Sequence, residues 1–135
     1  MKTAHDLVLA AKAQCTEISV KNASDVLQST DVIIDVREAD EFAVGHLAGA
    51  INIPRGLLEF KLSGTPALER CDMNVLLYCK TSGRSALAAT TMQAMGYLNV
   101  MSMAGGYDAW VAEGQPVVKL AQPAFDSRVS SQVAG

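Results

Sequence analysis

The stretch that decides the fold is NVLLYCKTSGRS, residues 74–85. It opens with consecutive apolar residues up to Cys79, a pattern typical of a strand that is buried on both faces of a sheet. A short loop that contains Gly83 follows, and a helical pattern then runs over residues 85–95 and ends at Gly96. A strand, a short loop and a helix in this order form half of a crossover unit, which indicates an α/β fold with a parallel sheet.

The rest of the chain repeats this alternation. Further strands are predicted at residues 17–20, 32–36, 50–53 and 99–103, and further helices at residues 22–28, 38–44, 56–62 and 107–112. Asn22 or Ser24 is the predicted N-cap of the helix at 22–28, and Gly45 is the predicted C-cap of the helix at 38–44. Strands and helices that alternate at this spacing predict a mostly parallel sheet.

Length and composition limit the function classes. The chain has 135 residues, 50% of them apolar, which suits one domain with a buried core. Its formal charge of −3, from 14 acidic and 11 basic residues, argues against nucleic-acid and membrane partners. The apolar stretch Leu7–Ala11 is shorter than a signal-peptide core of about 7–15 residues, so a cytoplasmic location is expected. It suits an amphipathic helix that Thr3 and Asp6 close as a capping box.

We therefore expect three segments. Residues 1–16 form a helical N-terminal extension, residues 17–118 form the domain, and residues 119–135 form a tail rich in Ser, Gln and Ala. Since the tail has no clear period, we expect it to be frayed or to pack loosely on the domain.

The three cysteines, Cys15, Cys71 and Cys79, need separate explanations. An odd number without paired spacing favours neither a disulfide framework nor a zinc site, so no metal is expected. His5 and His46 have no cysteine or carboxylate at a metal-ligand or triad spacing, and His46 suits a turn or the core. Cys15 and Cys71 are interpreted as inert packing or surface thiols.

Cys79 is the candidate reactive residue. Ligands of parallel sheets bind beyond the carboxyl ends of the strands, where Cys79 is placed. The loop after it leads into a helix N-terminus, whose amides and dipole favour an anion. No acidic residue occurs between Asp72 and Asp108, whereas Lys80 and Arg84 both lie in the loop. Buried structural cysteines are common, but this setting favours a thiolate.

Four stretches of the sequence resemble the rhodanese homology domain. They are DVRE with Glu41-Phe42 (residues 35–42), GHLAGAINIP (residues 45–54), CKTSGRS (residues 79–85) and GGYDAW continuing to GQPV (residues 105–117). Together they span about residues 17–118 in the family's order. The resemblance implies a three-layer fold, in which a five-stranded, mostly parallel sheet has helices on both faces.

The resemblance also implies a sulfurtransferase without a cofactor. In this family the Cys79 thiolate would take the outer sulfur of a donor such as thiosulfate and become a persulfide. A small thiol or cyanide would accept that sulfur, and a protein thiol is a further candidate. The substrate-binding loop would be Lys80, Thr81, Ser82, Gly83, Arg84 and Ser85. Arg84 and Lys80 would bind the donor's oxyanion, and Asp35 and Arg37 would support the site as an ion-pair network.

Two alternatives stay open at this point. Phosphatases and arsenate reductases of the same fold place five residues between their cysteine and arginine, whereas four separate Cys79 from Arg84. The shorter loop favours a single added sulfur over a phosphate. The second alternative is a non-catalytic binding module, but such domains often lack the cysteine that this chain keeps. The physiological donor and acceptor are not defined by these residues.

Overall fold

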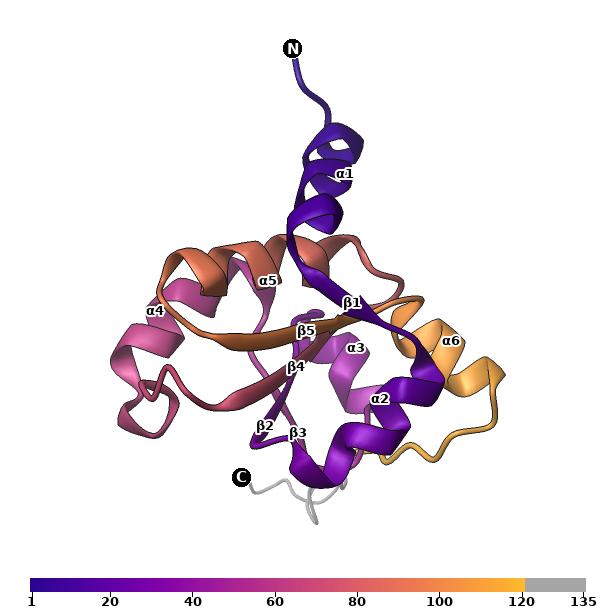
Figure 1. Ribbon diagram of the computed structural model, residues 1–135. Helices are drawn as coiled ribbons and strands as arrows, with labels where there is room; N and C mark the ends of the chain where they lie inside the picture. The colour runs from indigo at the N-terminus through magenta and orange to yellow at the C-terminus, as the bar shows by residue number, and fades with distance from the viewer. Residues whose placement is uncertain (121–135) are drawn as a thin grey trace, which may run out of the picture.

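A five-stranded parallel sheet forms the centre of the computed structural model, which describes residues 1–120 (Figure 1). Its strands are β1 (Thr16–Ile18), β2 (Val32–Asp35), β3 (Ala50–Asn52), β4 (Asn74–Tyr78) and β5 (Asn99–Met103). They lie in the order β1-β5-β4-β2-β3, and every neighbouring pair is parallel. The strand that was expected to be buried on both faces, β4, is therefore the central one, and Cys79 follows directly after it.

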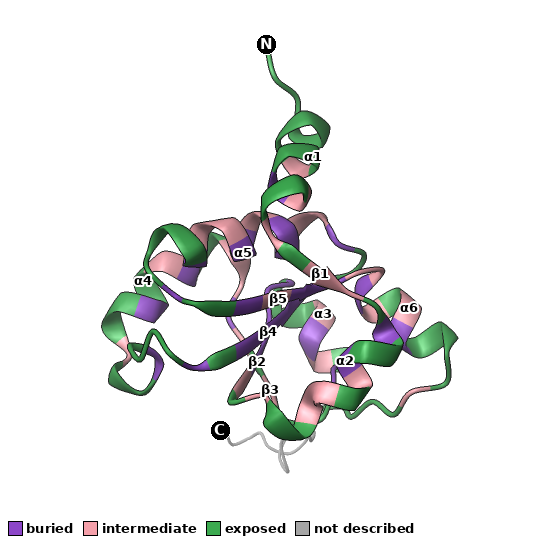
Figure 2. Ribbon diagram, in the orientation of Figure 1, coloured by how far each residue is buried: buried purple, intermediate pink, exposed green. Residues whose placement is uncertain are grey.

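Helices cover both faces of the sheet, as predicted. They are α1 (Ala4–Gln14), α2 (Val20–Val26), α3 (Ala39–Val44), α4 (Leu58–Gly64), α5 (Gly83–Ala94) and α6 (Gly106–Ala112), with single 3₁₀ turns at Leu27–Ser29, Arg55–Leu57 and Pro66–Leu68. Alternate residues of β4 enter two separate hydrophobic clusters, Val75 and Leu77 in one and Leu76 and Tyr78 in the other. The first cluster includes residues of α4 and α5, and the second includes residues of α2 and α6. Figure 2 shows the buried strands between these helices.

Two helices, α2 and α5, begin two residues earlier than predicted. Helix α2 begins at Val20, because the Ser19 hydroxyl accepts the amide of Asn22 at 3.1 Å and so caps the first turn. The N-cap is thus neither Asn22 nor Ser24. Helix α5 begins at Gly83, two residues before the predicted start. The loop between Cys79 and α5 is correspondingly shorter than the sequence suggests.

The N-terminal extension is the helix α1. Its capping box forms as predicted: Thr3 Oγ1 accepts the Asp6 amide at 3.1 Å, and Asp6 Oδ2 accepts the Thr3 amide at 2.9 Å. Helix α1 packs on α5, with Val8 next to Gly83. No helix within residues 1–120 has the length and apolar character needed to cross a bilayer. The expected loose tail falls almost wholly on residues 121–135, outside the described residues.

A buried ion pair links the end of β2 to the segment after α3. Arg37 donates from Nη2 to Asp35 Oδ2 at 2.7 Å and from Nε to Oδ1 at 3.0 Å, and both residues are almost fully buried. The same Nη2 donates to the Gly45 carbonyl at 2.6 Å. The guanidinium also lies over the ring of Tyr107, 4.2 Å from its centroid. Since Tyr107 belongs to α6, this pair connects three elements.

Replacing Arg37 by Met is expected to destabilise the fold strongly. It would leave the Asp35 carboxylate buried without its partner, a loss of about 3–5 kcal/mol in the free energy of unfolding. Urea unfolding followed by circular dichroism measures this. The matched control is Arg70→Met, which removes the exposed pair between Arg70 and Asp72 and should cost about 1 kcal/mol or less. Equal losses in both variants would contradict the structural role of Arg37.

Candidate active site

The Cys79 sulfur lies at the carboxyl end of the central strand, against the first turn of α5. The residue is 1% exposed. Its Sγ accepts a hydrogen bond from the Ser85 amide at 3.4 Å, and its thiol donates to Ser85 Oγ at 3.6 Å. An amide at a helix N-terminus that points at sulfur stabilises a thiolate more than a thiol. The structure thus brings Cys79 and Ser85 into direct contact.

A chain of buried hydroxyl groups continues behind Ser85. Ser102 Oγ donates to Ser85 Oγ at 2.8 Å, and Ser85 Oγ donates to the Ser82 carbonyl at 3.2 Å. Ser85 and Ser102 are fully buried. Because a hydroxyl rotates, Ser85 can turn its hydrogen toward either the Ser82 carbonyl or the Cys79 sulfur. Ser102 is a site residue that the sequence reasoning missed.

Helix α6 holds the active-site loop from outside. The Tyr107 amide donates to the Cys79 carbonyl at 2.8 Å, and the Asp108 amide donates to the Lys80 carbonyl at 3.0 Å. Gly106 makes this approach possible, since it has a φ of 56° and a Cβ there would overlap the carbonyl oxygens of Cys79 and Thr81. These two hydrogen bonds and the close contact at Gly106 hold the backbone of the loop against α6.

Both cations of the loop are paired with carboxylates. Arg84 donates from Nη1 to Glu41 Oε2 at 3.0 Å and from Nη2 to Glu41 Oε1 at 3.3 Å. Lys80 Nζ lies 2.8 Å from Asp108 Oδ2. The hydrogen bond from Arg84 lowers the pKa of Glu41 below its ordinary value. The positive island expected from the sequence is thus balanced by acids from α3 and α6, which are distant from the loop in the chain.

The family of the chain follows from comparison with known proteins. The model of the rhodanese-like domain matches residues 19–113, which include the loop and the elements that hold it. The chain belongs to the rhodanese-like domain family.

Relatives with known names include sulfurtransferases. Thiosulfate sulfurtransferase 16 of Arabidopsis thaliana is 34% identical over 110 residues, which cover 75% of this chain and 91% of the relative. The polysulfide-sulfur transferase homodimer of Wolinella succinogenes has a TM-score of 0.71 and 32% identity, covering 85% of this chain and 86% of that chain. A Rhodopseudomonas palustris protein of unknown function, described as a possible tyrosine phosphatase, has a TM-score of 0.80 and 29% identity, covering 87% and 96%.

The remaining predicted residues of this rhodanese-like domain take different positions. Ser82 is buried, Thr81 is exposed, and Gly83 begins α5. The polar contacts of Asp35 and Arg37 include each other and Gly45, so they brace the segments around the loop.

Two further polar residues, Arg55 and His46, lie outside the loop. Arg55, just after β3, bonds to Glu59 and Thr91. His46 is buried, with Nδ1 2.8 Å from the Phe42 carbonyl oxygen, as expected of a core histidine.

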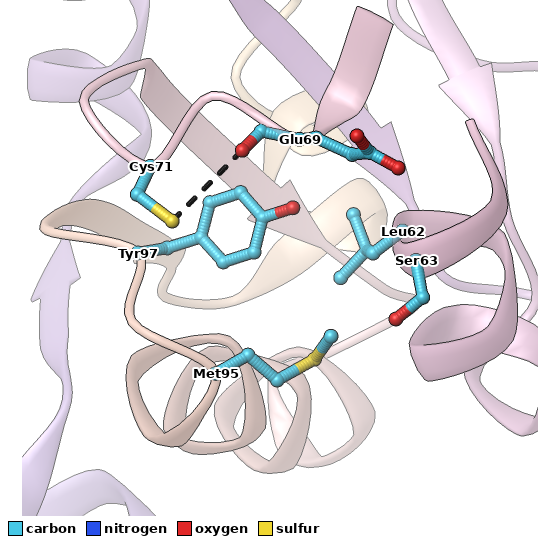
Figure 3. A pocket seen from close by; sticks show the side chains of 6 residues that line it. All are labelled: Leu62, Ser63, Glu69, Cys71, Met95 and Tyr97. Carbon is cyan, nitrogen blue, oxygen red and sulfur yellow. Dashed lines mark hydrogen bonds between the residues drawn. The ribbon is translucent and has the colours of Figure 1, made fainter. Parts of the chain in front are cut away.

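The other two cysteines lie elsewhere in the rhodanese-like domain. Burial raises the pKa of the Cys15 thiol and so favours its neutral form. Cys71 is exposed and precedes β4, so it lies at the opposite end of this strand from Cys79. Figure 3 shows it beside Tyr97 in an open pocket of about 290 Å³. Within residues 1–120, no group of three or more His, Cys, Asp or Glu side chains is placed to hold a metal ion.

Gly106→Ala is expected to disturb both the fold and the site. The added Cβ combines a strained positive φ with overlap on the loop backbone, a cost of about 2–5 kcal/mol in unfolding free energy. Gly114→Ala is the matched control, because Gly114 also has a positive φ, of 74°, but nothing within 4 Å of the added Cβ. That variant should lose only about 1–2 kcal/mol. Thermal unfolding of both variants tests whether close packing on the loop, rather than φ alone, requires Gly106.

Proposed function

We propose that this rhodanese-like domain transfers a sulfane sulfur from a small donor to a thiol or cyanide through a persulfide on Cys79. The observation that carries the proposal is the buried Cys79 sulfur, which accepts the Ser85 amide at the start of α5. The names of the relatives support a sulfurtransferase in general. The donor, the acceptor and the covalent intermediate are our inference from the site.

The proposed first half-reaction forms the persulfide. With thiosulfate as donor, the Cys79 thiolate attacks the outer sulfur, the new Sγ–S bond forms, and the sulfur–sulfur bond of thiosulfate breaks. The bonding electron pair leaves with sulfite, and the protein keeps one extra sulfur with a negative charge. This is covalent catalysis, in which one difficult transfer is divided into two easier ones.

The proposed second half-reaction restores the enzyme. A nucleophile such as cyanide attacks the outer sulfur of the persulfide, thiocyanate leaves, and the electron pair of the Sγ–S bond returns to Cys79 as thiolate. The Ser85 amide, which already points at the sulfur, would stabilise charge on it without reorganising during the reaction. The Ser85 hydroxyl would add a second donor by turning its hydrogen from the Ser82 carbonyl toward the sulfur. The fixed loop conformation suits a small, unchanging group better than a large one.

Phosphate-ester hydrolysis is the competing function, because a described tyrosine phosphatase candidate shares the fold. The four residues between Cys79 and Arg84 argue against it. In addition, Arg84, which would bind the phosphate, is held by Glu41. We expect no hydrolysis of p-nitrophenyl phosphate above the Cys79→Ser background. Robust hydrolysis that is lost in Cys79→Ser would instead identify a phosphatase.

Mass spectrometry of the thiosulfate-treated protein tests the persulfide. One added sulfur, about 32 Da, is expected on the peptide that contains Cys79. Cys79→Ser should abolish it, while the control Cys71→Ser, which removes the exposed thiol, should leave it unchanged. A sulfur adduct found only on Cys71, or none in any variant together with no thiocyanate formation, would contradict the proposed function and favour a non-catalytic binding module.

A further inference from the structure

The opening of the site carries two matched ion pairs. Arg84 uses two guanidinium nitrogens for the two oxygens of Glu41, and Lys80 faces Asp108. The Arg84–Glu41 side chains are 36% and 29% exposed, whereas those of Lys80 and Asp108 are 59% and 49% exposed. The Arg84 pair is therefore the better shielded from solvent and the stronger of the two. Neither loop cation is left without a carboxylate.

We propose that Glu41, with a smaller contribution from Asp108, sets the donor class of this site. By pairing with Arg84 and Lys80, these carboxylates favour organic persulfides as donors over the dianion thiosulfate. The inference rests on the proposed function, because it assumes that Cys79 receives a sulfane sulfur. Glu41 is then a specificity-determining residue that acts through Arg84.

Charge next to the transferred sulfur explains the preference. In thiosulfate this sulfur is bound directly to a sulfonate group, which needs a cation when it leaves water. Arg84 directly precedes Ser85, whose amide contacts the Cys79 sulfur. A sulfonate that binds Arg84 must share its guanidinium with Glu41 or displace Glu41 from it. An organic persulfide instead bears a carbon-linked sulfur at that position, so it carries less charge against the two carboxylates.

The corresponding transfer from a persulfide is balanced without an oxidant or reductant. The Cys79 thiolate attacks the terminal sulfur of R–S–SH, a new Sγ–S bond forms, and the S–S bond of the donor breaks. The electron pair leaves with the thiolate R–S⁻, and the proton stays on the transferred sulfur. The product is the same Cys79 persulfide.

Glu41 can be changed without removing its local structural role. Its Oε2 also accepts the Glu38 amide at 2.9 Å, as the second half of the capping box of α3. Glutamine serves in capping boxes as well, because its amide oxygen accepts the same bond. Glu41→Gln therefore removes the negative charge that faces Arg84 while α3 keeps its cap.

The test compares two donors across matched variants. Thiosulfate and 2-hydroxyethyl persulfide, whose organic group is uncharged, are assayed with wild type, Glu41→Gln, Asp108→Asn and Asp72→Asn. The last is the control, because it also removes one carboxylate from an ion pair, but before β4, at the end of the strand away from Cys79. In wild type, kcat/KM is expected to be higher for the persulfide.

Glu41→Gln should raise kcat/KM for thiosulfate by about threefold to tenfold, mainly through a lower KM, the scale of one partly exposed charge. Its kcat/KM for the persulfide should change by about twofold or less. Asp108→Asn should shift thiosulfate in the same direction by a smaller factor, and Asp72→Asn should shift neither donor. Added salt should then weaken thiosulfate use more in Glu41→Gln than in wild type.

Other results overturn the inference. A fall in thiosulfate use in Glu41→Gln would mean that Glu41 positions Arg84 for the oxyanion, and equal gains with both donors would exclude a role in donor choice. A wild type that prefers thiosulfate would also contradict it. These failures differ from failure of the proposed function, in which neither donor places a sulfur on Cys79.

Discussion

The site depends on two hydrogen bonds that the active-site loop receives from α6. The amides of Tyr107 and Asp108 hold the carbonyl groups of Cys79 and Lys80, and Gly106 permits the contact because it has no side chain. The central strand β4 delivers Cys79 to this place, and α5 supplies an amide to its sulfur. The loop is thus held by β4 at one end, by α5 at the other and by α6 alongside it. The Ser85 amide therefore points at the sulfur before a substrate binds. A site that is fixed in advance stabilises charge on sulfur without a reorganisation cost.

Charge around the site is balanced in pairs. Asp35 and Arg37 form the buried pair, and Arg84 and Lys80 form the more exposed ones. In the proposed reaction, a sulfur anion on Cys79 would rely on a backbone amide, the helix dipole and a hydroxyl group rather than on a free cation. Backbone amides are neutral, so they do not form ion pairs with nearby carboxylates and do not titrate with pH. In the proposed donor preference, the cationic side chains act on the donor, and Glu41 adjusts their effect through its pair with Arg84.

The sequence predicted the local parts of this picture and missed those that depend on distant contacts. The apolar run of β4 and the loop that follows led to the prediction that Cys79 and Ser85 belong to one site, because both features lie within one short segment. Ser102 was missed because only the pairing of β5 with β4 brings it behind Ser85. The loop was predicted to be a positive island because Glu41 and Asp108, the carboxylates that pair with Arg84 and Lys80, come from α3 and α6.

Gly45 shows the same limit of prediction from sequence. Gly45 was placed correctly at the end of α3, but its φ of 171° is ordinary extended backbone. A side chain there would overlap the Tyr107 hydroxyl.

The central claim, that Cys79 carries the sulfur between two half-reactions, is tested most directly with thiosulfate labelled in its outer sulfur. After the donor is removed, we predict one labelled sulfur per chain, which cyanide then releases as labelled thiocyanate. An isolated protein without label that still turns over thiosulfate and cyanide would contradict the account.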